Sequence, residues 1–530
     1  MEFPVESTDR RALWKPLGLP GVVTLREARR AREAEYQLLE PPSGPLFGST
    51  TLTADLRRAR RDSQLRSKRP AWRDSQSDEE QQEHEGSVES PEEQVRARWL
   101  AVFKGAKDHV DAVRRLRRAL RHPQASSAFC RIDGACRGLV GLLTGLSHPE
   151  MQLEAARCFL EMSLIEEPSV ALATLSAAPY LITFLGSESS RLTESCLLVL
   201  GNLGTEGETN VQTLLKQGLL PALRTCLQSW DPTVVEAAAF CLSQVLQGAE
   251  SLQSVTQALL KADMLPILLE LLRRWSHAPG ARQPHLGVPP IMEAAWCLHY
   301  ILCSGECTEQ LLHLGLVQAV GGAFCVLARM ILSGMILPGA ELLILPLARC
   351  LGNVAGLDVV RQTTGTQSCS VGPGVLAAGA VFCEHFSSHL PFLAKECLWL
   401  IHNIIECNAR AWSIVQHLGL APRLARLSSH AHGVGVMALV VLQNAARLDG
   451  AGIITQETGT EAVNRGLASS DSAALVPALQ LWELLLAGGH KEVIAGPGAE
   501  DILGALQLHP EFRVQELSTR LLLLLVQEKA

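Results

Sequence analysis

The sequence predicts an all-α chain of stacked helical repeats, and three observations lead to that prediction. Residues 394–406, AKECLWLIHNIIE, place Leu398, Ile401 and Ile405 on one helical stripe. Hydrophobic residues make up 47% of the chain and aromatic residues only 5%, so small and branched aliphatic side chains must form most of the core. Alternating β-branched runs, which would indicate strands, are scarce.

Helices comparable to residues 394–406 recur along the chain. They begin at Leu153, Thr193, Val235, Met292, Ala340, Ala394 and Val436. The positions that match Asn403 follow one another at intervals of 41 to 56 residues. A helical repeat of about 40 to 47 residues is typical of armadillo and HEAT proteins. We therefore expect a right-handed armadillo/HEAT-like superhelical solenoid, with insertions such as residues 277–290 in the longer intervals.

The N-terminal part of the chain is polar and its charge is polarised. Residues 1–23 are expected to be disordered, and residues 24–70 form a basic segment of two helices interrupted by a loop insertion at residues 40–54. Residues 55–69 carry seven basic side chains against two Asp, whereas the stretch 74–93 carries nine acidic ones and no Lys or Arg. We expect an acidic disordered linker at 71–93. Such charge asymmetry is typical of a partner-binding tail.

Residues 94–530 are expected to form the repeat solenoid. The first unit resembles a capping repeat, with Trp99, Val102 and Phe103 facing inward and the arginines outward. Each later repeat holds a Leu-rich helix, a turn and a longer helix, which we call the ladder helix. A proline after the turn, as at Pro149 and Pro232, favours the start of a ladder helix.

The basic segment resembles a known one. LRRARRDSQLRSKR, residues 56–69, is similar to the importin-beta-binding segment of importin-alpha, the nuclear import adaptor, and REARRAREAEY resembles the part just upstream. Together with the ladder helices, the resemblance extends over residues 25–527. The stretches AWCLHYI, LEAARC and LRRARRDSQLRSKR resemble more closely the family of transmembrane and coiled-coil domain-containing protein 6, an importin-alpha-like armadillo family.

The resemblance implies two binding sites. Importin-alpha binds basic signals with Trp–x–x–x–Asn pairs on its ladder helices, the Trp rings bracketing lysine stems and the Asn side chains holding the peptide backbone. The implied cargo-peptide residues are Trp399, Asn403, Trp296, Asn202, Asn353 and Asn444. The implied importin-beta contacts are Arg57, Arg58, Arg60, Arg61, Lys68 and Arg69.

The pair array departs from the family pattern, because only Trp399 and Asn403 form a complete pair. The other matching positions hold Arg157, Glu161, Leu198, Phe240, Gln244, Tyr300, Arg349 and Val440. Losing four contacts of about 1 kcal/mol each weakens binding roughly a thousandfold. The groove therefore binds either basic peptides weakly or another extended peptide. The alternative for the asparagines is structural, as caps or bridges between neighbouring repeats.

Other classes of function are disfavoured. The 15 cysteines are odd in number and scattered, as in an intracellular protein with reduced thiols. The apolar runs 314–328 and 330–340 are too short to span a membrane, and Arg329 separates them. The His and Cys residues lack the spacing of metal or catalytic motifs. We therefore expect no enzyme activity, no metal, no cofactor, no nucleic-acid partner and no integral membrane span.

The expected function is that of an importin-alpha-like adaptor in the cytoplasm and nucleus. Its concave armadillo surface would bind basic or other extended cargo peptides, and its basic segment would bind importin-beta. The alternative is a membrane-associated or cytosolic armadillo scaffold for protein–protein interaction with no import role.

Overall fold

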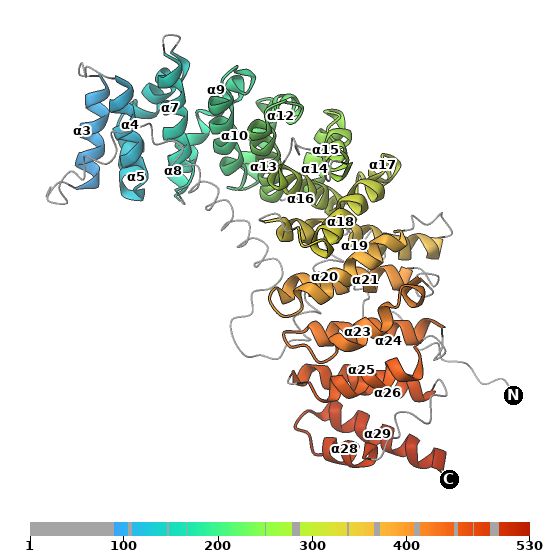
Figure 1. Ribbon diagram of the computed structural model, residues 1–530. Helices are drawn as coiled ribbons and strands as arrows, with labels where there is room; N and C mark the ends of the chain where they lie inside the picture. The colour runs from blue at the N-terminus through green and yellow to red at the C-terminus, as the bar shows by residue number, and fades with distance from the viewer. Residues whose placement is uncertain are drawn as a thin grey trace. The chain divides into compact units, whose positions relative to one another are not determined.

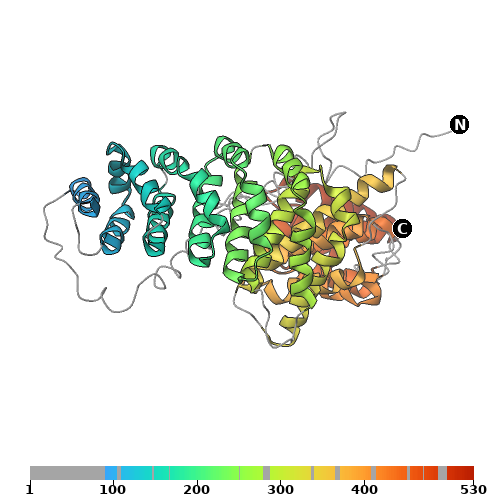
Figure 2. The ribbon, with the colours of Figure 1, turned by 90° about the horizontal axis from the view of Figure 1, so that it is seen from above.

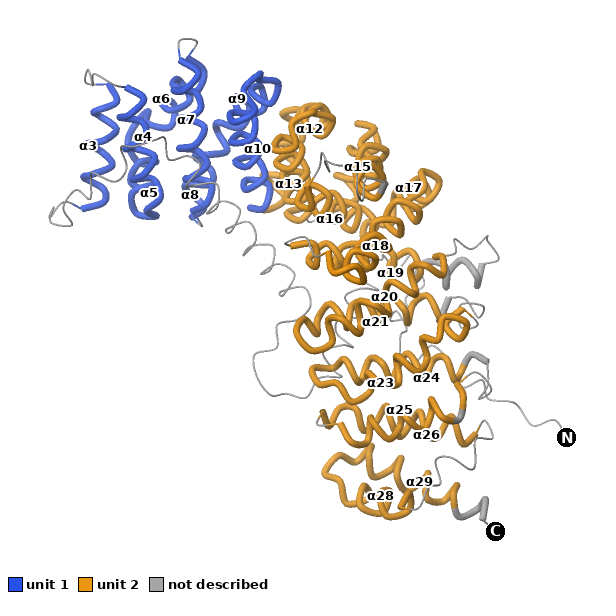
Figure 3. The backbone as a smooth tube through the Cα atoms, viewed as in Figure 1, with its two compact units in different colours: residues 1–206 blue, residues 207–530 orange. Residues whose placement is uncertain are grey.

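A computed structural model describes most of the repeat region as helices. It covers residues 90–103, 109–145, 148–165, 167–249, 251–277, 287–335, 339–364, 371–407, 414–449, 454–469, 471–487 and 498–529. Within these ranges all regular secondary structure is helical. The chain divides into two compact units, residues 1–206 and 207–530 (Figure 3). Each unit is a stack of helical repeats (Figure 1), which confirms the predicted all-α solenoid of armadillo type.

Unit 1 contains a two-helix start followed by two repeats. Its helices are α3 (Pro91–Phe103), α4 (His109–Leu120), α5 (Pro123–Arg131), α6 (Ala135–Thr144), α7 (Pro149–Met162), α8 (Pro168–Leu175), α9 (Ala178–Thr183), η1 (Phe184–Gly186) and α10 (Ser190–Gly204). The ladder helices are α4, α7 and α10, and each contacts the next. The blue-to-green helices lie in successive rows in both Figure 1 and Figure 2.

Unit 2 begins with three repeats of three helices each. These comprise α11 (Glu208–Lys216), α12 (Leu219–Leu227), α13 (Pro232–Gly248), α14 (Leu252–Lys261), α15 (Leu265–His277), α16 (Val288–Ser304), α17 (Thr308–His313), α18 (Leu316–Leu332) and α19 (Ala340–Thr364). The later helices are α20 (Pro373–Phe386), α21 (Pro391–Cys407), α23 (Leu420–Leu427), α24 (Val434–Asp449), α25 (Gln456–Leu467), η2 (Ser472–Ala474), α26 (Leu475–Ala487), α28 (Ala499–Leu506) and α29 (Phe512–Lys529).

Two parallel rows of helices organise unit 2. The ladder row runs α13, α16, α19, α21, α24, α26 and α29, and a second row runs α15, α18, α20, α23 and α25; successive members of each row are in contact. All seven ladder helices predicted from the repeat pattern are present across the two units. Because α16, α19, α21, α24 and α26 each lie between two ladder helices and also contact the second row, their apolar residues are buried on several sides, as Leu398 and Ile401 of α21 show at 0% and 1% exposure.

A recurrent turn joins the first and second helices of a repeat. Gly218 between α11 and α12, and Gly315 between α17 and α18, adopt left-handed backbone conformations with φ of 89° and 81°. This conformation favours glycine because it has no Cβ. Asp263 takes the same place between α14 and α15 with φ of 53°. Proline at the first turn starts α7 and α13, as the sequence predicts.

In the two-helix start of unit 1, α3 and α4, two side chains differ from the predicted inward and outward orientation. Trp99 and Val102 are buried, but Phe103 is 57% exposed, because the Trp99 ring already packs against Phe129 and Phe103 meets it edge-on from outside. Arg117 is 4% exposed rather than outward-facing, because it pairs with Glu154 of α7 at 3.0 Å. The predictions for residues 1–23, for the basic segment 24–70 with its insertion, and for most of the acidic linker lie outside the described residues.

Candidate peptide-binding ladder

The predicted cargo residues lie on the ladder helices, where each helix meets the preceding one. In unit 2, Trp296 is on α16, Asn353 on α19, Trp399 and Asn403 on α21, and Asn444 on α24. Asn202 is on α10 in unit 1. The four helices of unit 2, α16, α19, α21 and α24, follow one another in its ladder row, as the periodicity predicts.

Trp399 and Asn403 of α21 both contact Gly352 of α19. The Trp399 ring lies over Gly352 so closely that a Cβ added there would be 2.6 Å from Cη2. One turn later, the Nδ2 of Asn403 donates to the Gly352 carbonyl at 3.2 Å. Asn403 is 4% exposed, and Trp399 is half-buried. The pair therefore joins α21 to α19 in the free protein.

The other two amides of unit 2 contact buried histidines. The Nδ2 of Asn353 lies 3.5 Å from Nδ1 of His299, and that of Asn444 lies 2.9 Å from Nδ1 of His402. In both cases the asparagine lies on the ladder helix that follows the histidine's own. His299 and His402 are 1% and 0% exposed. The contacts thus bridge α16 to α19 and α21 to α24.

Trp296 is buried within the same run of contacts. Its ring stacks on Tyr300 with centroids 6.1 Å apart and meets His299 edge-on at 5.6 Å. At 3% exposure it is part of the core in this state. These contacts form one continuous run across four ladder helices, which we call the ladder seam. The ladder seam consists of Trp296, His299, Gly352, Asn353, Trp399, His402, Asn403 and Asn444.

Sequence reasoning missed the histidines and Gly352. A signal for the histidines was present, because both ladder tryptophans are followed three residues later by histidine, in WCLHY and in WLIHN. Residues three apart on a helix lie close together on its surface, so the repeated Trp–x–x–His spacing marks His299 and His402 as equivalent positions of two ladder helices. Gly352 could be found only from the structure, since the spacing within α21 says nothing about the backbone opposite it.

Asn202 in unit 1 differs from the other amides. Its Nδ2 donates to Oγ of Ser163, just after α7, at 3.0 Å. The side chain is 2% exposed, and among the residues that the structure describes its Oδ1 has no hydrogen-bond partner. Buried acceptors are almost always paired in folded proteins. The Oδ1 of Asn202 is therefore an unused acceptor at a ladder position.

Two ladder positions that hold Trp in the family pattern hold buried arginines here. Arg349 on α19 makes two hydrogen bonds to Glu396 on α21, at 3.2 and 2.6 Å. Arg157 pairs with Glu154 on its own helix α7 at 2.8 Å, and Glu154 also pairs with Arg117 of α4. Each of these arginines is about 5% exposed. The ion pair of Arg349 therefore joins two ladder helices, and that of Arg157 lies within α7.

Buried thiols occupy the position next to several of these side chains. Cys158, Cys297 and Cys350 lie 3.6 to 3.9 Å from a backbone carbonyl of the preceding ladder helix, to which they donate. Burial raises the pKa of Cys158 and Cys350 well above the ordinary thiol value. Protonated, enclosed thiols are poor nucleophiles and poor metal ligands. Their role is packing.

The remaining predictions concern importin-beta contacts, metal ligands and membrane-spanning helices. The residues predicted to contact importin-beta lie outside the described residues: Arg57, Arg58, Arg60, Arg61, Lys68 and Arg69. No group of three or more metal-ligating side chains occurs in the described ranges. No single described helix has both the length and the apolar character needed to cross a membrane, although the bent pair 168–175 and 178–186 has them jointly. The run 314–328 falls largely in α18.

Two solved structures match this chain to different degrees. The crystal structure of an engineered protein matches with a TM-score of 0.57 and 20% identity, covering 82% of this chain and 98% of that one. A designed armadillo repeat protein in complex with the peptide (KR)4 matches with a TM-score of 0.34 and 17% identity over 58% of this chain and 98% of its own. Only the first score is high enough to bear on the fold.

The sequence comparisons identify the family. Importin subunit alpha-9 of Arabidopsis thaliana is 27% identical over 367 residues, which are 66% of this chain and 64% of that protein. The chain thus matches less than two thirds of this curated relative's length. The family model described as TMCO6 matches residues 97–511, which is most of the chain. The predicted resemblance is confirmed: the chain belongs to the TMCO6 family of armadillo-like proteins and has a distant relative in importin-alpha.

Proposed function

We propose that this chain is an importin-alpha-type adaptor, which binds an extended peptide on its ladder helices and importin-beta through residues 24–70. The import role is supported by the likeness to importin subunit alpha-9. Such an adaptor would act in the cytoplasm and the nucleus. The peptide-binding role is carried by one observation, the unused acceptor of Asn202.

The orientation of the Asn202 amide follows from its neighbour. A serine hydroxyl has one proton, and Ser163 donates it to the carbonyl of Leu160 at 2.8 Å. Its oxygen can therefore only accept from the Nδ2 of Asn202, which leaves Oδ1 on the other side of the amide. An unpaired buried acceptor costs about 1–3 kcal/mol. The backbone N–H of a bound peptide is a donor that would remove this cost once the residues that cover Oδ1 move aside.

The ladder chemistry also indicates what kind of peptide fits. Amides recognise a peptide backbone and not a particular side chain. Arg349 already pairs with Glu396, so its charge is compensated. Selectivity would come from the half-buried ring of Trp399, since an indole face attracts the stem and charge of a lysine or arginine. The expected cargo is an extended peptide with one or two basic residues and an affinity below that of a full pair array.

A peptide titration tests this role. We expect a labelled basic peptide to bind the full chain, and Trp399→Ala to weaken binding by about 1–2 kcal/mol through loss of the aromatic wall. Asn202→Ala should weaken it by about 1 kcal/mol, because a backbone hydrogen bond is lost. Asn464→Ala, on the second-row helix α25, is the matched control and should bind as the wild type does.

The titration also has an outcome that contradicts the proposal. Equal affinity of the wild type, Trp399→Ala and Asn202→Ala would show that the ladder is not the binding face. Absence of binding by the wild type to basic and neutral extended peptides alike would remove the peptide-binding role. Asn403→Ala should lower the melting temperature as well as the affinity, because the Asn403 amide also donates to the Gly352 carbonyl in the free protein.

Capture of importin-beta tests the import role separately. Residues 55–69 are basic enough for recognition through charge, so exchanging Arg57, Arg58, Arg60 and Arg61 for Glu should abolish capture by the full chain. Added salt should weaken the wild-type complex. Charge reversal at the exposed Arg96 and Arg513 is the control and should leave capture unchanged. Capture that survives the fourfold exchange would show that importin-beta does not bind this segment.

A further inference from the structure

Two half-exposed thiols lie together in unit 1, on the turn between α5 and α6. Cys130 is in the last turn of α5, and Cys136 is in the first turn of α6. Their side chains hydrogen-bond to each other. Thirteen cysteines have described side chains; ten of these are buried, and Cys325 is the third that is half-exposed. Among these thirteen, Cys130 and Cys136 are the one pair in which two half-exposed thiols are in contact.

We propose that Cys130 and Cys136 form a reversible oxidation site, which a hydroperoxide converts to a disulfide within the α5–α6 turn. This inference does not depend on the proposed adaptor function. The short turn between the helices keeps the thiols within reach, because Ile132 donates to Phe129 at 3.1 Å and Ala135 to Ile132 at 3.1 Å. The residues around the pair, Arg131 and Asp133 among them, are exposed, so a small oxidant can reach both sulfurs.

The surroundings assign different roles to the two sulfurs. The hydrogen bond from Cys130 lowers the pKa of Cys136, although burial opposes it. Cys136 also lies in the first turn of α6, where the helix N-terminus favours a thiolate. The same hydrogen bond, with burial, raises the pKa of Cys130 far above that of an ordinary thiol. Cys136 is therefore the nucleophile, and Cys130 is the thiol that resolves the intermediate.

The two steps balance with one hydroperoxide. The Cys136 thiolate attacks one oxygen of H2O2, the O–O bond breaks, and Cys136 becomes a sulfenic acid while the departing hydroxide takes a proton to form water. Cys130 then attacks the Cys136 sulfur, the S–O bond breaks, and the departing hydroxide takes the Cys130 proton. The products are one disulfide and two waters. A dithiol reductant reverses the reaction by exchange.

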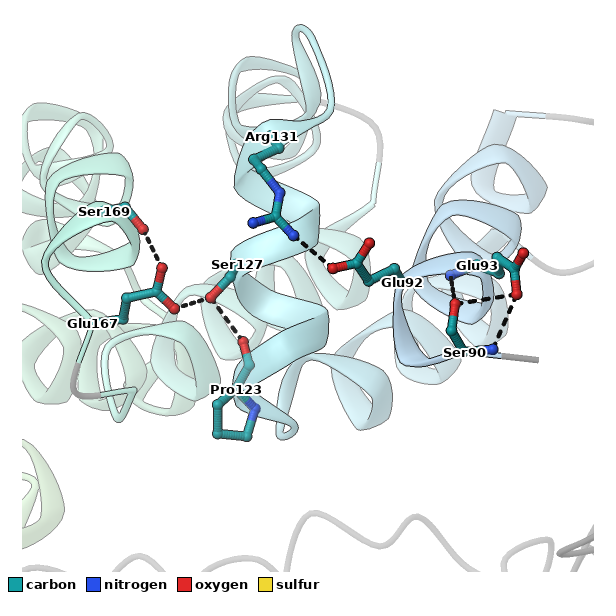
Figure 4. A network of polar contacts seen from close by, with 8 residues as sticks. All are labelled: Ser90, Glu92, Glu93, Pro123, Ser127, Arg131, Glu167 and Ser169. Atoms are coloured by element: carbon teal, nitrogen blue, oxygen red, sulfur yellow. Dashed lines mark hydrogen bonds and ion pairs between the residues drawn. The ribbon is translucent and has the colours of Figure 1, made fainter. Parts of the chain in front are cut away.

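A polar network holds α5 in place beside the dithiol, as Figure 4 shows. Arg131, next to Cys130, pairs with Glu92 of α3 at 2.7 Å. One turn earlier, Ser127 donates to Glu167, which precedes α8 and also accepts from Ser169 at 2.6 Å. These hydroxyl contacts hold the pKa of Glu167 below its ordinary value, so it remains a carboxylate. Contacts on both sides of α5 keep its last turn, and with it Cys130, in position against α6.

Peptide mapping of the full chain tests the site. The reduced protein is treated with H2O2 near stoichiometry, alkylated with iodoacetamide and digested with trypsin. Cleavage after Arg131 separates Cys130 from Cys136, so the disulfide is detected as residues 122–131 joined to residues 132–137. We expect this linked species in the oxidised sample, its loss after dithiothreitol, and alkylation of Cys136 several times faster than that of Cys325 at pH 7.

Single substitutions separate the two roles. Cys130→Ser should leave Cys136 as a sulfenic acid that dimedone labels, and Cys136→Ser should give neither the link nor the label. Cys325→Ser is the matched control and should form the link as the wild type does. Circular dichroism of each variant checks that the helices are retained. The proposal is overturned if both thiols stay reduced at peroxide levels that oxidise Cys325, or if either thiol links to another cysteine instead.

Discussion

Trp399 has room for its ring because residue 352, opposite it on α19, has no side chain. An added methyl group would lie 2.6 Å from Cη2 and 2.9 Å from Cε3, closer than carbon atoms approach without displacement. The neighbouring contact of Asn403 uses the carbonyl of the same Gly352 at 3.2 Å. One residue without a Cβ therefore supports both members of the complete pair, and the pair depends on it as much as on its own two side chains.

Replacing Gly352 by alanine should destabilise unit 2 by about 1–3 kcal/mol, as expected for overpacking at a site that cannot give way. The Trp399 ring should be displaced toward solvent. Thermal unfolding and a red shift of tryptophan fluorescence, compared with a Trp399→Phe background, measure the two effects. Gly504→Ala on α28 is the control: no atom lies within 4 Å of its added Cβ, so it should be neutral or slightly stabilising. Equal stability of both variants would contradict the close contact.

The sequence revealed which residues share a face but not what lies opposite that face. Helical spacing placed Trp399, Asn403 and the other ladder amides on the ladder helices, where the structure has them. Their partners are a backbone carbonyl and two histidines of other helices, about 40 to 55 residues away, and no local pattern encodes them. Phe103 failed for the same reason, since an apolar residue at a suitable spacing is buried only if the neighbouring repeat leaves room for it.

The second row of helices in unit 2 also has an ion pair between repeats. Arg423 of α23 makes two hydrogen bonds to Glu384 of α20, at 2.6 and 2.7 Å. Arg426 adds a contact at 3.6 Å. The Arg423 guanidinium holds the pKa of Glu384 below its ordinary value. Both side chains remain about one third exposed, so solvent screens the pair and its contribution to stability is about 0.5 kcal/mol.

The stabilisation by Glu384 should depend on pH. Because the folded-state pKa is depressed, the contribution is complete above the unfolded-state pKa of about 4.3 and is lost as pH falls through the lower folded-state value. Glu384→Gln should therefore lower the melting temperature slightly at pH 7, and the difference from wild type should shrink as the pH falls below about 4.3 and vanish below the folded-state pKa. Glu150→Gln at an exposed position of α7 is the control and should show no such trend. A difference that does not shrink as the solution is acidified would mean that the side chain acts by packing.

At the scale of elements, repeat periodicity was sufficient to place the ladder helices. Each predicted helix is present, because a buried stripe must recur wherever a repeat stacks on its neighbours. The left-handed turn residues also recur, but one of them, Asp263, is not glycine and breaks the pattern in the sequence. The division of the chain after residue 206 could not be predicted, since the ladder spacing continues across it unchanged.

In the chain as a whole, stability should be distributed along the repeats and not concentrated in one core. Within each unit, every ladder helix contacts the ladder helix of the next repeat. In such an arrangement, stability is close to a sum of repeat terms and nearest-neighbour terms. Phe129 of unit 1 and Phe324 of unit 2 are both 0% exposed. Each therefore contributes to the stability of its own repeat and of the neighbouring repeats only.

Truncating either phenylalanine should have a local effect. Phe129→Ala should cost about 3–5 kcal/mol and increase amide hydrogen exchange mainly in residues 91–204. Phe324→Ala should increase exchange mainly within unit 2, around α18 and α20, where the ring centroids of Phe324 and Phe382 are 4.7 Å apart. Each variant serves as the control for the other in exchange measured by mass spectrometry. Uniform acceleration along the chain in both variants would show a single cooperative unit.

The contacts of Asn353 with His299 and of Asn444 with His402 give the ladder seam a mechanical property. Each amide ties two successive ladder helices together, and a peptide backbone that engaged the amide would compete for that tie. Ligand binding would then make the affected repeats more compliant. Because coupling between binding and conformation is reciprocal, a force that separates the repeats would in turn alter affinity. The same few hydrogen bonds would therefore determine both the stiffness of unit 2 and its affinity for a peptide, and binding of a peptide would lower that stiffness.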